Sequence, residues 1–310
     1  MALINIDLKD TEMKKIFIVF GLLLISGNVH AALNIFACEP EWAALAQEIG
    51  GEKVSIYAAT NALQDPHHIE ARPSLIARAR RAQLVVCTGA ELEIGWLPVV
   101  LRESGNADVA SGKPGNFEAA KYITMQEVPT HLDRADGDVH AAGNPHIQLD
   151  APDYPAIARA LSERLSELDT ANSPYYQARL QTFTQKWQAA LLRWQQQAAP
   201  LKGNSIVVQH KAFPYLTSWL GLIEVASLEP KPGVEPSASH LSQVLATLQQ
   251  HPARMVIRAA YQNPKPSEWI AERAHIPAVV LPFSVGGTEG AKDLFGLFDD
   301  TVARLLAGLK

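Results

Sequence analysis

The 310-residue chain has 27 Lys and Arg residues against 32 Asp and Glu, a net charge of -5, and a hydrophobic fraction of 47%. This composition is that of an ordinary globular protein and excludes a disordered or repetitive chain. It provides no basic face for nucleic acid, so we expect no such partner. A chain of this length exceeds the usual size of one hydrophobic core, which predicts two lobes.

Residues 1–31 have the pattern of an export signal. A Lys-Lys pair precedes an apolar run at 16–25, and small residues lead to a cleavage site after Ala31. The run is too short to span a bilayer, which needs about 20 residues. Three acids precede Met13, which suits no signal peptide, so we expect translation to start at Met13. The mature protein is then soluble and periplasmic. The alternative interpretation of the apolar run at 16–25 is an amphipathic or buried helix.

Residues 32–170 predict an α/β lobe. Short apolar runs alternate with helical patterns, and this β-α-β order implies a parallel sheet with helices on both faces. The strands are expected at Leu33–Ala37, Val54–Ala58 and Leu84–Cys87, with a short fourth strand at 108–110. Cys38 and Cys87 follow or end two of these strands. In an oxidising compartment they can form a disulfide, and two buried thiols are the alternative.

Residues 171–200 predict one long helix between the lobes. Apolar and aromatic residues recur at helical spacing from 175 to 199 without an internal breaker. At 1.5 Å per residue this helix is roughly 35 Å long, enough to brace two lobes. Residues 201–310 then repeat the β-α order of the first lobe, with strands expected at Ser205–Val208, 223–228, 254–257 and Ala278–Leu281.

Three histidines stand in comparable places. His67 belongs to an Asp-Pro-His-His-Ile-Glu loop after a predicted strand, and His210 directly follows another strand. His146 ends a Gly-Asn-Pro-His turn. Ligands of open α/β sheets bind outside the carboxyl ends of the strands. We therefore expect these three histidines to meet in one cleft and hold a metal ion, although each by itself can be a surface residue.

Two further segments can contribute to such a site. Residues 113–143 are rich in Gly, Pro and Asp and contain His131 and His140; a loop of this length is functional or mobile. After the last predicted strand, Glu289 is the acid best placed to reach a cleft and Asp293 is the second. An exposed loop carboxylate is the alternative for Glu289.

Several motifs together resemble a known family, the substrate-binding proteins of zinc and manganese ABC importers (cluster A-I receptors). The similarity covers essentially the whole mature chain. Its motifs are the Gly-Gly-Glu-Lys-Val at 50–54, Asp-Pro-His at 65–67 with a following Arg-Pro-Ser, Ala-Gln-Leu-Val-Val at 82–86, Gly-Ala-Glu-Leu-Glu at 89–93, Gly-Asn-Pro-His at 143–146 and Gln-His-Lys-Ala-Phe-Pro-Tyr at 209–215.

The resemblance implies two Rossmann-like lobes joined by one long helix, with metal bound between them. His67 and His146 are the implied ligands from the first lobe and His210 the ligand from the second, with His68 beside the site or at the surface. The family usually supplies an Asp after the last strand, but this chain has none there before Glu289. The fourth ligand is therefore Glu289, Asp293 or water.

Three imidazoles suit zinc, whereas manganese prefers more oxygen ligands. We therefore expect a zinc receptor that delivers its ion to an ABC permease, acts as a monomer and is not an enzyme. The alternatives are a manganese receptor of the same family, a zinc hydrolase, whose metal site has a similar layout, and a metal-binding adhesin. The chain contains no His-Glu-x-x-His motif to favour the hydrolase.

Overall fold

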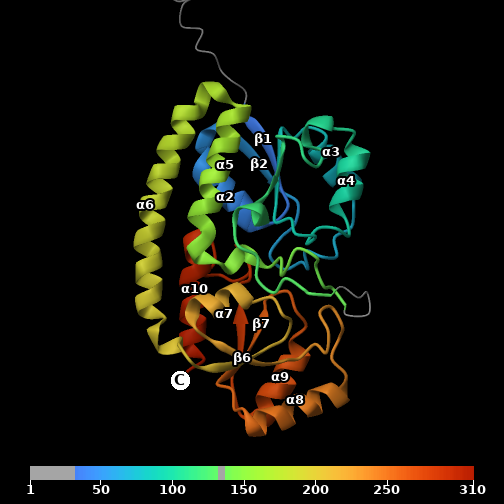
Figure 1. The fold of residues 1–310 in the computed structure, drawn as a ribbon, viewed down its shortest axis with the longest axis vertical. Coiled ribbons are helices and arrows are strands. Elements are labelled where there is room, and N and C mark those ends of the chain that lie inside the picture. Colours follow the sequence, from blue (N-terminus) through green and yellow to red (C-terminus); the bar gives the residue numbers. More distant parts are fainter. Residues whose placement is uncertain (1–31, 132–136) are drawn as a thin grey trace, which may run out of the picture. The chain divides into compact units, whose positions relative to one another are not determined.

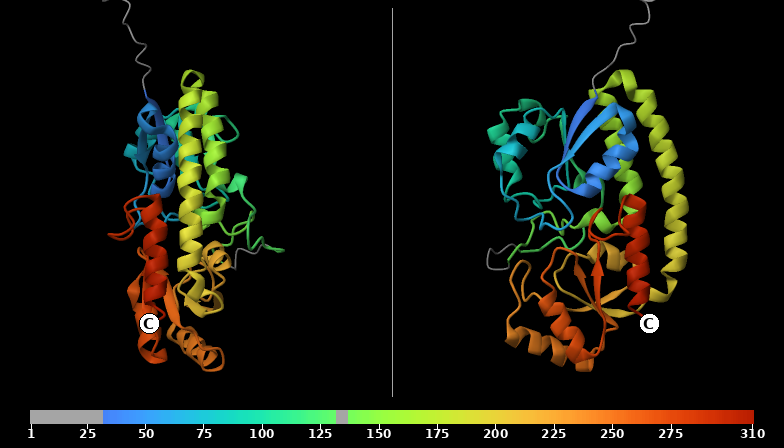
Figure 2. Two further views of the ribbon diagram at one scale, coloured as in Figure 1. Left: turned by 90° about the vertical axis from the view of Figure 1, so that its left-hand side faces the viewer. Right: turned by 180° about the vertical axis from the view of Figure 1, so that it is seen from behind.

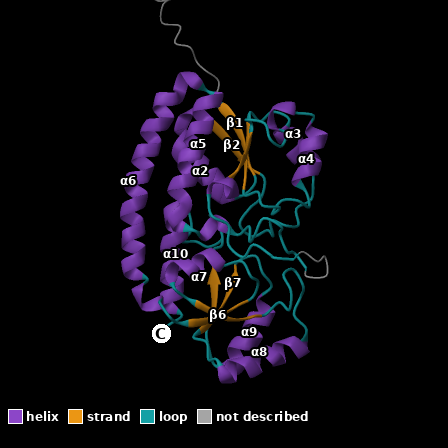
Figure 3. Ribbon diagram, viewed as in Figure 1, coloured by secondary structure: helices purple, strands orange, loops and turns teal. Residues whose placement is uncertain are grey.

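The computed structural model describes residues 32–131 and 137–310, so the predicted signal peptide and its cleavage site lie outside the described residues. Residues 33–310 contain two four-stranded parallel sheets, flanked by helices (Figures 1 and 3). The predicted fold class, two α/β lobes with parallel sheets and a long connecting helix, is confirmed. None of the helices in the described part of the chain is long and apolar enough to cross a membrane.

The first sheet has the strand order β2-β1-β3-β4, formed by β1 (Leu33–Ala37), β2 (Val54–Ala58), β3 (Leu84–Cys87) and β4 (Asn116–Glu118). The expected strand at 108–110 is wrong. That stretch begins as a 3-10 helix, Ala107–Val109, because the Asn106 side chain accepts a hydrogen bond from the Asp108 amide. The fourth strand forms later and pairs with β3 through Val86 and Phe117.

The second sheet repeats this topology in the order β6-β5-β7-β8. Its strands are β5 (Ser205–Val208), β6 (Ile223–Ser227), β7 (Met255–Ala259) and β8 (Ala278–Leu281). In both sheets the first strand of the lobe is internal and the second lies at an edge. Because all strands of a sheet are parallel, the loops that follow them emerge at one end of that sheet.

Helices alternate with the strands in both lobes. α4 begins at Leu97, after a series of turns that includes Ala90 and Glu91, whose φ angles are positive at 49° and 68°. The Ser237 side chain caps α8 by accepting a hydrogen bond from the His240 amide. The helices are α2 (Pro40–Gly50), α3 (Pro73–Ala79), α4 (Leu97–Ser104), α5 (Tyr154–Leu168), α6 (Ser173–Gln197), α7 (Pro214–Leu220), α8 (Ala238–Gln250), α9 (Pro264–Ala274) and α10 (Leu294–Ala307).

The long helix α6 runs past both sheets, and it packs against α2 and α5 of the first lobe and α10 of the second (Figures 1 and 2). Its inward face carries Trp187 and Trp194, both fully buried. Trp187 donates to the Ala151 carbonyl at 2.8 Å, and Trp194 donates to Asp299 at 2.6 Å. One continuous apolar core therefore extends along α6 through both lobes.

Cys38 and Cys87 form a disulfide bond, which settles the choice between a disulfide and two buried thiols. Their Cα atoms are 4.8 Å apart because Cys38 directly follows β1 and Cys87 ends the neighbouring strand β3. The bond fixes the carboxyl ends of these two strands to each other, close to the loops that follow them.

Buried glutamates lie beside this disulfide and reach the second lobe. Burial raises the pKa of Glu39, and it raises the pKa values of Glu41 and Glu93 to about 7. The Ser284 hydroxyl, in the loop after β8, donates a hydrogen bond to the Glu41 carboxylate at the start of α2. This contact joins the two lobes through a carboxyl group that prefers to be protonated.

Truncation of the α6 core is expected to destabilise the whole chain. Trp187→Ala removes a fully buried indole and leaves a cavity, so the free energy of unfolding should fall by about 3–5 kcal/mol. The matched control is Leu192→Ala on the same helix, where the side chain is 61% exposed, and a change within about 0.5 kcal/mol is expected. Denaturant unfolding measures both; equal effects would contradict the assignment of the core.

The Glu41 carboxyl is expected to make stability fall as pH rises. Its pKa is raised from 4.5 to about 7, so the native state keeps a proton that the unfolded chain has released. The contribution is fully present below pH 4.5 and is lost as pH passes through 7. Glu41→Gln should therefore gain stability relative to the native sequence, by roughly 1–3 kcal/mol, between pH 5 and pH 8.

Thermal unfolding of both proteins across that pH range measures this gain. Glu163→Gln, which replaces an exposed glutamate of α5, is the control. A constant difference between Glu41→Gln and the native sequence at all pH values would show that Glu41 does not retain its proton.

Candidate metal site

The three predicted histidines lie together. His67 follows β2, His146 precedes α5 and His210 follows β5, and one nitrogen from each lies within 4.8 Å of the others. Their ring centroids are 5.2 Å apart for His67 and His146, 5.2 Å for His146 and His210, and 6.0 Å for His67 and His210. All three side chains are buried. The carboxyl-end loops of both lobes thus contribute to one cluster.

Two of the histidines are held by the same local device. In Asp65-Pro66-His67, the Asp65 carboxylate accepts hydrogen bonds from both the backbone amide and Nδ1 of His67, at 3.0 and 2.8 Å. In Asn144-Pro145-His146, the Asn144 side-chain oxygen accepts from the amide and Nδ1 of His146 at the same distances, 3.0 and 2.8 Å. Each Asx side chain folds back on the residue two positions later and fixes the direction of the imidazole.

The third histidine has an equivalent partner from another segment. Glu229, which follows β6, lies 2.6 Å from Nδ1 of His210 and also accepts from the Gly233 amide at 2.8 Å. A carboxylate accepts hydrogen bonds and cannot donate one, so Nδ1 carries the proton. Sequence reasoning missed Glu229; its position just after a strand that neighbours β5 in the sheet is the signal that could have identified it.

These hydrogen bonds also connect the two lobes. Besides orienting His146, Asn144 donates through its side-chain amide to the Lys211 carbonyl at 2.8 Å, next to His210. The Tyr215 hydroxyl donates to the Asn144 carbonyl at 2.7 Å. The turn that carries His146 in the first lobe is therefore tied directly to the loop that carries His210 in the second.

The inward nitrogens are available to a ligand. Nε2 of His67 and Nε2 of His146 are buried and have no hydrogen-bond partner among the residues that the structure describes. A buried polar atom without a partner is costly, and such atoms require an explanation. Burial, with a smaller contribution from the neighbouring histidines, holds the pKa of His146 well below 6.5. Its imidazole is therefore neutral, as a metal ligand must be.

Glu289 is not brought to the cluster. It is exposed in the loop after β8 and does not belong to the group of ligand atoms formed by the three histidines. Asp293 caps α10 by accepting a hydrogen bond from the Gly296 amide at 2.7 Å. The residue that this loop places near the cluster is Phe283, whose ring centroid is 5.9 Å from that of His146. His68 is 69% exposed and lies 3.9 Å from the Asp138 carboxylate.

A fourth histidine lies beside the cluster. His140, in the predicted loop 113–143, stacks on His67 with a centroid distance of 5.4 Å. Its Nε2 is also buried without a hydrogen-bond partner in the described ranges. Burial is the largest factor that lowers the pKa of His140, to about 4. Sequence reasoning placed His140 in a functional or mobile loop but did not predict that it would face His67.

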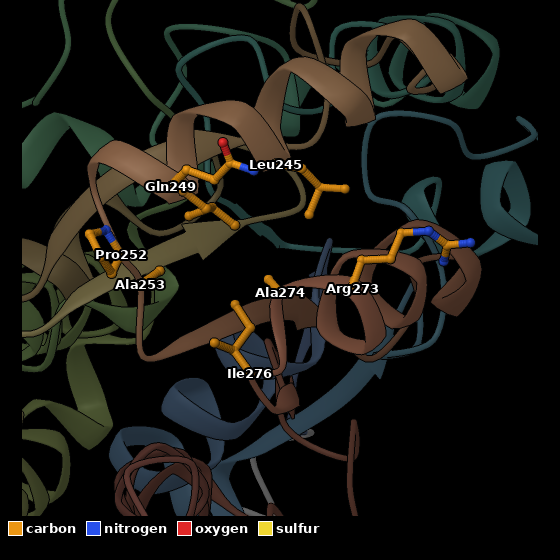
Figure 4. Close-up of a pocket in the computed structure, with 8 residues that line it drawn as sticks. Leu245, Gln249, Pro252, Ala253, Arg273, Ala274 and Ile276 are labelled. Atoms are coloured by element: carbon orange, nitrogen blue, oxygen red, sulfur yellow. The ribbon is translucent and has the colours of Figure 1, made fainter.

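Other candidate sites are less suited to a metal. The cavity between α8 and α9 is lined by Leu245, Leu248, Gln249, Pro252, Ala253, Arg273, Ala274 and Ile276 (Figure 4). It contains no acid, histidine or cysteine and is therefore not a metal site. Cys38, Cys87 and Glu93 also lie close together, but both sulfur atoms are committed to the disulfide.

Comparisons with known proteins identify the family of the chain. The family model described as ZnuA, the periplasmic component A of the zinc-uptake complex, matches residues 35–308. The high-affinity zinc uptake system protein ZnuA of Yersinia pestis is 26% identical over 232 residues, which cover 70% of this chain and 72% of that protein. The manganese ABC transporter substrate-binding lipoprotein PsaA of Streptococcus pneumoniae is 21% identical over 281 residues, 86% of each chain.

Solved structures show the same fold. A crystal structure of ZnuA superimposes with a TM-score of 0.72 at 22% identity, and a mutant of the laminin-binding adhesin Lmb from Streptococcus agalactiae does so with a TM-score of 0.74 at 20% identity. Each match covers 90% of this chain and 100% of the other.

The family match spans nearly all of the described chain, and family members are substrate-binding transport proteins. The hydrolase alternative is therefore wrong. The chain belongs to the ZnuA family of metal-binding, extracytoplasmic substrate-binding proteins of ABC transporters.

Proposed function

We propose that this protein captures zinc outside the inner membrane and delivers it to the permease of an ABC importer. The observation that carries the proposal is the cluster of three buried imidazoles whose close ligand atoms include no carboxylate in the described part of the chain. Imidazole nitrogen suits zinc, whereas manganese prefers oxygen. The zinc-uptake relative and the matching family model agree with this choice, while the manganese-binding relative represents the competing one.

The lobes have distinct roles in this proposal. Residues 32–170 form the lobe that carries His67 and His146, residues 201–310 form the lobe that carries His210, and residues 171–200 form the connecting helix. Zinc bound by the cluster links the two lobes. The loaded protein, acting as a monomer, is the form that the permease recognises.

Export through a signal peptide removed after Ala31 is part of the same proposal. The disulfide between Cys38 and Cys87 supports it, because such bonds persist in the periplasm and are rare in the cytosol. Mass spectrometry of the protein recovered from the periplasm should give a chain that starts at Ala32. A chain that retains residues 1–31 would contradict removal of the signal.

The ligand set is tested by zinc titration. Calorimetry on the mature chain should show one zinc per molecule. His67→Ala, His146→Ala and His210→Ala should each weaken zinc binding about 100-fold or more, because loss of a hydrogen-bond partner behind a ligand already costs up to about 100-fold in affinity. His251→Ala, an exposed histidine after α8, is the control. Unchanged affinity in the three variants would refute the site.

The partner of His210 is tested separately. Glu229→Ala removes the acceptor that orients the imidazole, so zinc affinity should fall about 10- to 100-fold with the fold intact. Glu229→Gln retains an acceptor oxygen and should recover part of the loss. Glu235→Ala, an exposed acid in the same segment, should bind zinc as the native protein does. If Glu229→Ala also binds normally, Glu229 has no role in positioning His210.

A further inference from the structure

The histidine cluster supplies three ligands, whereas protein-bound zinc is generally four-coordinate. The loop after β8 does not provide a carboxylate. Phe283 points its ring toward His146 and is buried against Phe213 and Tyr261, with centroid distances of 6.1 and 5.2 Å. Glu289, farther along this loop, is exposed. An apolar ring thus occupies the side of the cluster where an acidic ligand was expected.

His140 approaches the cluster along the face of His67. The two rings are stacked with an interplanar angle of 28° and a centroid distance of 5.4 Å. The Nε2 atoms of His67, His146 and His140 are all buried, and none of them has a hydrogen-bond partner in the described residues. His140 also lines the cavity that borders His146 and His210. An imidazole with a free, buried nitrogen therefore stands next to a three-nitrogen cluster.

The backbone around His140 is held from both lobes. The Ala141 amide donates to the Glu91 carboxylate at 2.9 Å, and the Asp138 amide donates to the Pro232 carbonyl at 2.9 Å. The Gly143 amide donates to the His140 carbonyl at 3.1 Å and closes the turn that leads to His146. Glu91 has a positive φ of 68°, a conformation that non-glycine residues adopt at a cost and that is concentrated at functional positions.

We propose that His140 is the fourth protein ligand of the metal, so that the site holds zinc by four imidazoles. This inference rests on the zinc-binding function proposed above. The His140 nitrogens lie outside the group whose ligand atoms are all within 4.8 Å of one another. A rotation of the half-buried His140 side chain toward the three other rings therefore accompanies binding.

Four imidazole ligands make the site selective by ligand chemistry. Zinc, copper and nickel accept such a set, whereas manganese prefers carboxylate, carbonyl and water oxygen. The positive charge of the ion is balanced outside the ligand set by Asp65 and Glu229, which accept from Nδ1 of His67 and His210. Nitrogen ligands and outer carboxylates thus replace a directly bound acid.

The test compares two histidines near His67. His140→Ala removes the stacked residue, and His68→Ala removes a neighbour that is also close, with a centroid distance of 6.1 Å, but 69% exposed. X-ray absorption at the zinc edge should count four imidazoles in the native protein and in His68→Ala, and three in His140→Ala. Zinc affinity should fall about tenfold or more in His140→Ala alone. His140→Asp should shift the competition between zinc and manganese toward manganese.

The outcomes separate this inference from the function on which it depends. If His140→Ala retains four imidazoles or native affinity while His146→Ala loses zinc, the inference is overturned and the zinc site stands. An equal loss in His68→Ala and His140→Ala also overturns it. If His146→Ala binds zinc normally, the proposed function itself fails. Circular dichroism of the metal-free variants verifies that each remains folded.

Discussion

The site depends on the hydrogen bonds that hold Nδ1 of each clustered histidine. Asp65, Asn144 and Glu229 each present an oxygen to one ring, and this contact directs the opposite nitrogen toward the centre of the cluster. Without these acceptors an imidazole can rotate or take the other tautomer, and its ligand atom then points elsewhere.

The fold brings the acceptors and the rings together through repeated topology. Both sheets have their first strand inside and their second strand at the edge, and the loops after β2 and β5 carry His67 and His210. The disulfide joins the ends of β1 and β3 beneath the first loop. Trp96 supports this loop by donating to the Pro66 carbonyl at 2.9 Å. His67 and His210 are thus held close to strand ends rather than on long free loops.

Sequence patterns predicted the parts of the structure that depend on local chemistry. Seven of the eight strands in the described residues and the long helix follow from apolar runs and helical spacing. The meeting of His67, His146 and His210 follows from two histidines placed after strands and a third that ends a Gly-Asn-Pro-His turn. The fourth strand of the first sheet was not predicted, because Asn106 caps a 3-10 helix at 107–109 and the strand forms later, at Asn116–Glu118.

The surroundings of the cluster were harder to predict from the sequence. Glu229 reaches His210 across 19 positions of the chain, and His140 reaches His67 from a segment without a periodic pattern. Glu289 is the first acid along the chain after β8. The backbone after β8, however, turns Phe283 inward, with a positive φ of 64°, and leaves Glu289 in solvent. Spacing along the chain cannot show which way such a turn faces.

The shared core along α6 has a consequence for building hybrid proteins from this family. Trp187 and Trp194 belong to the connecting helix but pack on Phe298 of α10, with centroid distances of 5.3 and 5.0 Å. A lobe exchanged at a boundary near residue 200 would separate these rings from the partner against which their shapes are fitted. Hybrids should therefore transfer α10 together with the carboxyl half of α6, because the natural unit of exchange follows the packing and not the two sheets.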